Sequence, residues 1–95
     1  MNIQYVGFAV ATTSRSYSFR VFEALQQTRE FTVKIQLGAF RSTSLKFQDG
    51  PDICFARLKQ KLENETPETR VEHHLRLGDQ EIEDYLQRRH QRKRR

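Results

Sequence analysis

The feature that most limits the possible folds of this chain is a switch in hydrophobic periodicity at residues 49–52. Before the switch, apolar side chains recur at every second residue, as in half-buried strands, and after it they recur with helical spacing. The switch segment itself, Asp49-Gly50-Pro51-Asp52, suits a helix start. Proline is tolerated in the first helical turn, and carboxylates there complement the positive end of the helix dipole. Strands followed by a helix predict an α+β domain.

Alternating apolar and polar residues predict four strands before the switch. They span residues 3–10, 16–23, 30–37 and 45–48. The first strand is apolar on both faces, and Gly7 lies between its two apolar pairs, where a β-bulge would switch the side-chain face. Short polar connections between these strands predict an antiparallel meander with one face exposed to solvent.

Beyond the switch, the sequence predicts a helix, a fifth strand and a second helix. The first helix spans 52–64, and its apolar stripe is the right width to lie on a sheet. Alternation over 71–77 predicts the fifth strand, and Asp79 is a suitable N-cap for the C-terminal helix. We therefore expect an antiparallel four- to five-stranded sheet with one helix packed on a face and a second C-terminal helix, in the order ββββαβα.

Length and composition exclude several classes of protein. The 95 residues allow one domain. No run of about 18 apolar residues is present to span a membrane, and the apolar start lacks the cationic region of a signal peptide. The single cysteine, Cys54, rules out an internal disulfide. These features predict a cytoplasmic protein that does not bind membranes.

The net charge of +5 is unevenly distributed along the chain. Residues 1–48 carry six Lys and Arg against two acids, and residues 49–87 carry five against ten. The last eight residues carry six Lys and Arg and no acid. The charges therefore predict a domain over 1–87 with a net charge near neutral, followed by a basic tail over 88–95.

A basic tail of this kind neutralises phosphates without reading bases, which predicts sequence-independent binding of nucleic acid or another polyanion. The candidate residues are the cations of the tail with two cations on the polar strand faces: Arg88, Arg89, Arg92, Lys93, Arg94, Arg95, Arg20 and Lys34. Arg41 and Lys46 would extend this surface. We expect loss of residues 88–95 to change stability little.

Two alternatives to polyanion binding stay open. The tail is either solvated or folded back on the acidic segment 49–87. In those cases the domain is a protein-interaction or self-associating module. Its surface would be an exposed sheet edge or the helix face formed by Ile82, Tyr85 and Leu86.

Catalysis has weak support in the sequence. Cys54 lies near the start of a helix, where the dipole lowers a thiol pKa, and His73 or His74 is a candidate base. However, Cys54 belongs to the apolar stripe of its helix, which predicts burial. The two histidines are adjacent, so on a strand they face opposite sides and cannot bind one metal ion together. We expect a non-catalytic protein without cofactor or metal.

Overall fold

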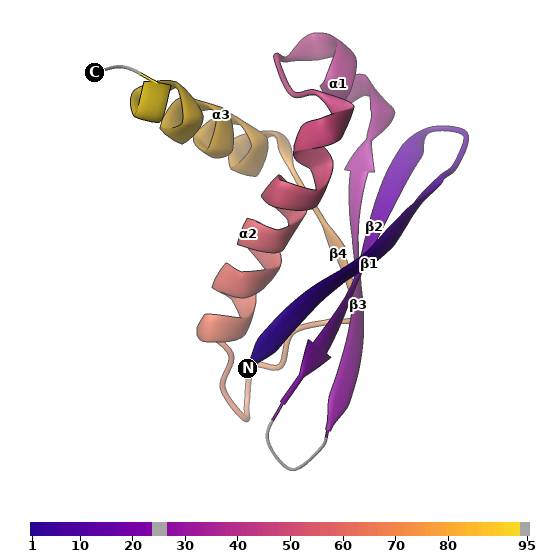
Figure 1. The fold of residues 1–95 in the computed structure, drawn as a ribbon, viewed down its shortest axis with the longest axis vertical. Coiled ribbons are helices and arrows are strands. Elements are labelled where there is room, and N and C mark those ends of the chain that lie inside the picture. The colour runs from indigo at the N-terminus through magenta and orange to yellow at the C-terminus, as the bar shows by residue number, and fades with distance from the viewer. Residues whose placement is uncertain (24–26, 94–95) are drawn as a thin grey trace.

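The computed structural model is an α+β fold with a four-stranded sheet, as predicted (Figure 1). It describes the backbone of residues 1–23 and 27–93 and the side chains of 1–23 and 27–89. The elements are β1 (Asn2–Val10), β2 (Ser14–Phe22), β3 (Thr28–Gln36), α1 (Leu37–Ser42), the 3₁₀ helix η2 (Phe47–Asp49), α2 (Gly50–Glu63), β4 (His74–Arg76) and α3 (Asp79–Lys93). Helices α2 and α3 lie on the same side of the sheet (Figure 1).

The sheet has the order β1-β2-β3-β4. The first three strands form the predicted antiparallel meander, but β4 runs parallel to β3. The expectation of a purely antiparallel sheet is therefore wrong. The chain returns across the sheet as α2 before it enters β4, and such a crossover connection brings the next strand in parallel to the last.

The predicted strand over 45–48 is also wrong. Leu45 is buried from a loop, and Phe47 begins η2 instead of continuing a strand. Two apolar residues around one polar residue are too short a pattern to distinguish a strand from a turn. Upstream, the short helix α1 begins at Leu37, the last residue of the strand predicted over 30–37. It ends where the Thr43 hydroxyl donates a 2.7 Å hydrogen bond to Ala39 O.

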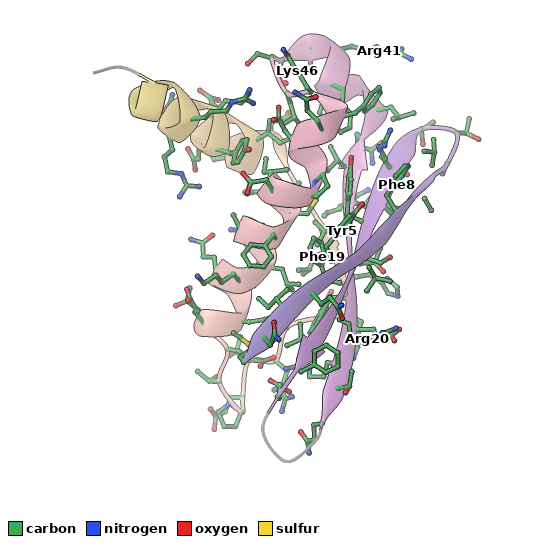
Figure 2. The ribbon with its side chains drawn as sticks, in the orientation of Figure 1. Tyr5, Phe8, Phe19, Arg20, Arg41 and Lys46 are labelled. Carbon is green, nitrogen blue, oxygen red and sulfur yellow. The ribbon has the colours of Figure 1, made fainter. Side chains whose placement is uncertain are left out.

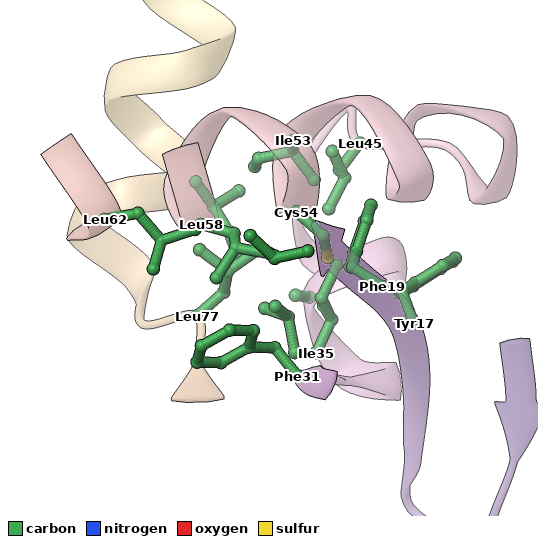
Figure 3. Packing of buried hydrophobic residues seen from close by; sticks show 14 residues of the cluster. Tyr17, Phe19, Phe31, Ile35, Leu45, Ile53, Cys54, Leu58, Leu62 and Leu77 are labelled. Carbon is green, nitrogen blue, oxygen red and sulfur yellow. The ribbon is translucent and has the colours of Figure 1, made fainter. Parts of the chain in front are cut away.

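The core lies between α2 and the side chains of β2 and β3 that face it (Figure 3). Alternate residues of each strand are buried, while α2 contributes the predicted apolar stripe. The largest fully buried side chains are Tyr17, Phe19, Val21, Phe31, Val33, Ile35, Leu45, Cys54 and Leu58. Gly50 is required at the start of α2, because a Cβ there would overlap the Tyr17 ring and hydroxyl.

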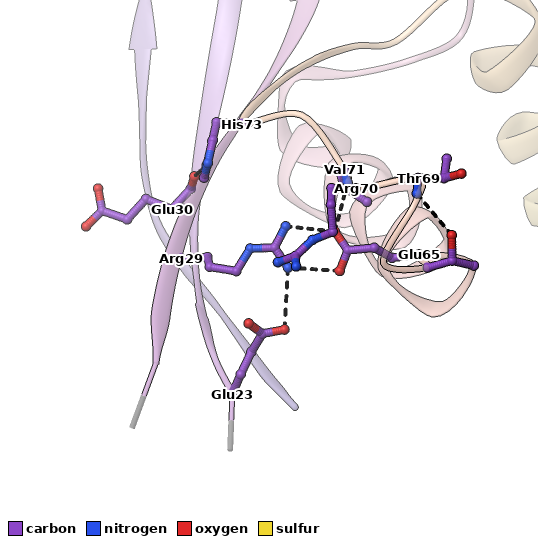
Figure 4. Close-up of polar contacts among 9 residues, drawn as sticks. Glu23, Arg29, Glu30, Glu65, Thr69, Arg70, Val71 and His73 are labelled. Carbon is purple, nitrogen blue, oxygen red and sulfur yellow. Dashed lines mark hydrogen bonds and ion pairs between the residues drawn. The ribbon is translucent and has the colours of Figure 1, made fainter. Parts of the chain in front are cut away.

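A polar network ties β3 to the segment that follows α2 (Figure 4). Arg29 donates two hydrogen bonds to the Glu65 carboxylate, at 2.9 and 2.8 Å. Glu65 also accepts a 2.7 Å hydrogen bond from the Val71 amide. The bonds from Arg29 outweigh the opposing effect of burial and lower the pKa of Glu65 to about 2. The bidentate geometry makes this a strong, charge-assisted contact.

Helix α3 spans Asp79–Lys93, so Asp79 is its first helical residue and not the predicted N-cap. Ile82 is buried in the core, and Tyr85 and Leu86 pack against it. The helices within residues 1–23 and 27–93 include none that is long and apolar enough to cross a membrane.

Candidate binding surfaces

The first candidate surface is the outer edge of β1. This strand pairs with β2 on one side, and nothing in the described part of the chain pairs with its other side. It is nine residues long, whereas β4 at the opposite edge has three. Residues 1–14 contain no charged side chain. Natural edge strands are usually short, charged or covered, and β1 has none of these protections along most of its length.

A β-bulge sets the faces of β1. The register with β2 shifts between Tyr5 and Gly7, as the sequence predicts, and Gly7 has a φ of 159°. Because of the extra residue, Tyr5 and Phe8 both pair with core-facing residues of β2. In a regular strand, residues three apart would lie on opposite faces. The side chains of Tyr5, Phe8 and Val10 therefore form one row on the helix side of the sheet.

This row is only partly covered. Tyr5 is 39% exposed, Phe8 54% and Val10 61%, and the bulge residue Val6 is 52% exposed. Figure 2 shows Tyr5 and Phe8 along β1. In a chain whose body is otherwise rich in charge, these exposed apolar residues on one strand are a candidate interaction surface. We call Tyr5, Phe8 and Val10 the β1 row.

Arg15 holds one end of the β1 row in place. Its guanidinium lies between two exposed rings, 4.2 Å from the centroid of Phe8 and 4.6 Å from that of Phe47. The Phe47 ring in turn packs 4.7 Å from Phe40. Cation–π contacts of this kind orient the aromatic rings. The contact with Arg15 therefore favours the surface position of the Phe8 ring.

The main chain of β1 offers hydrogen-bonding groups along the same edge. The Ala11 amide donates to Ser14 O at 2.8 Å, which closes the β1–β2 turn. Hydrogen-bonded and non-hydrogen-bonded pairs alternate in an antiparallel ladder. Counting back from this turn, the N–H and C=O groups of Val10 and Phe8 point away from β2. The edge therefore presents both donors and acceptors.

The cations predicted on the sheet lie on its other face. Arg20 forms a 3.4 Å ion pair with Glu30. Lys34 lies directly opposite Arg76 of β4, and both are exposed. Figure 2 shows Arg41 and Lys46 near α1, toward the end of the sheet remote from Arg20. Sequence reasoning missed Arg76, because its position beside Lys34 depends on the parallel pairing of β4.

The predicted tail cations are not joined to that face. The Arg89 Nη1 donates a 2.6 Å hydrogen bond to Asp49 Oδ2, so this residue is held by the start of α2. Arg88 is exposed and lines a groove of about 740 Å³ between α2 and α3, together with residues of both charge signs. The side chains of Arg92 and Lys93, and all of Arg94 and Arg95, lie outside the described residues.

The helix face predicted as an alternative interaction surface is already occupied. Ile82 is buried, and the Tyr85 hydroxyl donates a 2.7 Å hydrogen bond to Asp52 on α2. Burial, followed by this bond to a carboxylate, raises the pKa of Tyr85 to about 12. Of the two surfaces predicted for an interaction module, the structure leaves the sheet edge exposed.

Cys54 and His73, the residues considered for catalysis, lie in different environments: the first is buried and the second is exposed. Cys54 is fully buried, and burial raises the pKa of its thiol, so the thiol is neutral. His73 is exposed, stacks 5.3 Å from Phe31, and places Nδ1 2.8 Å from Glu30 O. Among residues 1–23 and 27–89, no cluster of three or more His, Cys, Asp or Glu side chains is placed to hold a metal ion.

Comparison with known proteins adds no further assignment. No family model, curated protein or solved structure matches this chain. Sequence reasoning did not single out Val6, Phe8 and Val10, although one signal was available. The run of fourteen uncharged residues at the start contrasts with a sequence that is 31% charged.

Proposed function

We propose that this chain is a non-catalytic protein-interaction module that binds an extended partner segment by strand addition to the outer edge of β1. The observation that carries the proposal is the combination, on one nine-residue edge strand, of free main-chain groups, an exposed apolar row and no charge. Long apolar edges without protective charges pair readily with other strands.

Strand addition would use both parts of the surface. The outward N–H and C=O groups of Phe8 and Val10 would supply main-chain hydrogen bonds, which provide affinity for any extended peptide. The β1 row would supply side-chain contacts that favour apolar residues at alternate positions of the partner. Arg15 supports this role, because its cation–π contact favours the exposed position of the Phe8 ring.

A labelled strand peptide tests this proposal. The probe is a nonapeptide of alternating Val and Thr, flanked by lysines for solubility, and its binding to the full chain is measured by fluorescence anisotropy. Val10→Pro removes an outward N–H without touching the β1–β2 ladder, which is the position an edge strand tolerates for proline. Val10→Thr is the matched control, because it keeps both the N–H and β-branching.

We expect the wild type and Val10→Thr to bind the probe and Val10→Pro to lose most of the binding, with the same far-UV circular dichroism in all three. Equal binding by Val10→Pro would place the peptide elsewhere and overturn the proposal. So would the absence of binding by the wild type at concentrations where the chain is monomeric.

A second function, sequence-independent binding of the nucleic-acid backbone, has one specific observation in its favour. Residues 88–95 carry six cations and no acid. Six phosphate contacts limit the slope of log K against log salt to about −5 on duplex DNA. Lys34 and Arg76 would form a separate contact, because they lie side by side on the sheet face away from α3. This contact would be weaker, because it has two cations where the tail has six.

The two cationic groups can be separated by variants. A labelled DNA duplex at low salt is titrated with the full chain, a chain ending at Arg89 and the double variant Lys34→Gln/Arg76→Gln. We expect the shortened chain to lose most of the salt-dependent binding and the double variant to lose little. If the shortened chain binds as tightly as the full chain, the tail is not the site.

A further inference from the structure

We propose that the partner of the β1 edge is a second copy of this chain, whose β1 pairs antiparallel with the first across a two-fold axis near Ala9. This inference rests on the proposed strand addition at β1 and names its occupant. The result would be a closed dimer with a continuous eight-stranded sheet.

The chemistry of β1 makes it complementary to itself. Residues 1–14 are the longest uncharged stretch of the sequence, so the two edges would meet without burying a charged side chain. Burial of an unpaired charge is the usual reason that two identical edges do not join. A second copy also brings the same exposed apolar row, so each copy would cover exposed side chains of the other.

The opposite edge of the sheet is a poorer partner surface for β1. β4 is only three residues long and carries His74 and Arg76 at its ends. Pairing β1 with β4 of the next copy would be head-to-tail and would build an open filament. The mismatch in length and charge disfavours that arrangement. Pairing of β1 with β1 uses the same surface on both copies and therefore closes at two.

The bulge fixes the register. It divides β1 and leaves a regular stretch from Gly7 to Val10. In this stretch the main-chain groups of Phe8 and Val10 point away from β2, counting back from the Ala11–Ser14 bond. A two-fold axis near Ala9 lets Phe8 of each copy form a hydrogen-bonded pair with Val10 of the other. In this register the most exposed side chains of the β1 row, Phe8 and Val10, cover one another across the axis.

The two-fold axis also determines which faces meet. Antiparallel strands in one sheet are related by an axis perpendicular to the sheet, so the helices of both copies lie on the same side. The β1 rows of the two copies, which lie on the helix side, become neighbours. The sheet faces that carry Lys34 and Arg76 join into one surface on the other side.

The oligomeric state tests the inference first. Sedimentation velocity over a wide concentration range should show a monomer–dimer equilibrium for the wild type. Val10→Pro and Val10→Lys should both sediment as monomers, the first through loss of an N–H and the second through an added charge. Phe22→Lys is the matched control, because Phe22 is an exposed aromatic residue on β2 and not on the edge. It should remain dimeric.

Disulfide trapping then tests the register. Ala9→Cys places two thiols across the axis at a Cα separation of about 4.5 Å, which suits a disulfide. Gln4→Cys lies on the same strand, yet with the bulge residue left out of the count its two copies would be about 26 Å apart at about 3.3 Å per residue. We expect the first variant to form a covalent dimer on mild oxidation and the second to stay monomeric. Cross-linking of both would indicate parallel pairing and overturn the register.

The outcomes separate this inference from the function on which it rests. A chain that stays monomeric at all concentrations but binds the Val–Thr peptide retains the interaction function with a different partner, and the second-copy inference is overturned. A dimer that persists in both Val10→Pro and Val10→Lys has its interface elsewhere, which also overturns it. A monomeric chain that binds no strand peptide refutes both.

Discussion

At the residue scale, the burial of Cys54 argues against a role for its thiol as a nucleophile. Cys54 lies near the start of a helix, where a dipole would activate a thiol, but the side chain has no exposure and burial raises its pKa. We expect Cys54 to react slowly with a thiol reagent in the native state and rapidly in denaturant. In the variant Thr12→Cys, at the exposed β1–β2 turn, one thiol should react fast and the other slowly. Two fast native thiols would contradict the burial.

Glu65 links the stability of the fold to pH, because folding lowers its pKa. Its pKa is lowered from 4.5 to about 2 in the folded state. The form that accepts the hydrogen bonds from Arg29 is therefore the ionised carboxylate. The stabilisation is complete above pH 4.5 and is lost as the pH falls through about 2. Glu65→Gln should cost about 1.5–3 kcal/mol at neutral pH, the range for a hydrogen bond to a charged group.

The pH dependence gives a second readout for Glu65. The difference in unfolding free energy between the wild type and Glu65→Gln should shrink as the pH falls from 4.5 toward 2. Urea denaturation at several pH values measures it. Glu30→Gln is the control, because Glu30 belongs to an exposed ion pair with Arg20, and such pairs contribute little. A constant difference between pH 7 and 2 would mean that the carboxylate is not held as described.

At the scale of elements, α2 depends on its apolar stripe. Leu58 is fully buried at the centre of this stripe, between Cys54 and Leu62. Leu58→Ala should cost about 2–5 kcal/mol, because it removes buried methyl groups and leaves a cavity. The exposed neighbour Lys59→Ala should change stability by less than about 0.5 kcal/mol. Chemical denaturation of both variants measures the loss in unfolding free energy. Similarly small losses for Leu58→Ala and Lys59→Ala would mean that the apolar stripe is exposed to solvent.

The elements also show what a sequence of this kind can reveal. The three N-terminal strands, α2 and the bulge at Gly7 were predictable, because periodicity and glycine are local signals. The direction of β4 was not, since it depends on the path of the chain over the sheet. The exposure of Phe8 was not predictable either. An apolar row looks the same in sequence whether its strand is central or at the edge, and strand order is settled by the tertiary fold.

At the scale of the whole molecule, the ion pair between Arg89 and Asp49 changes the expectation for the C-terminal segment. A cut after Arg89 keeps this contact, whereas a cut after Gln87 removes it. We expect the chain ending at Arg89 to melt close to the full chain, and the chain ending at Gln87 to lose about 1.5–3 kcal/mol. Thermal and urea unfolding of both truncations measure the difference. Equal stability of the two would mean that Arg89 is not docked.

The bulge in β1 has a consequence for how the strand tolerates length change. Without Val6, the remaining residues of β1 alternate without interruption, and Tyr5, Phe8 and Val10 would keep the faces they have now. Val6 is thus a single-residue insertion in an otherwise regular strand, and its deletion should be compatible with the fold. Bulges twist an edge and limit its pairing. The shortened strand would offer a straighter edge that is regular over a longer stretch. Deletion of the single residue Val6 would therefore turn a chain that pairs over a short segment into one prone to extended aggregation.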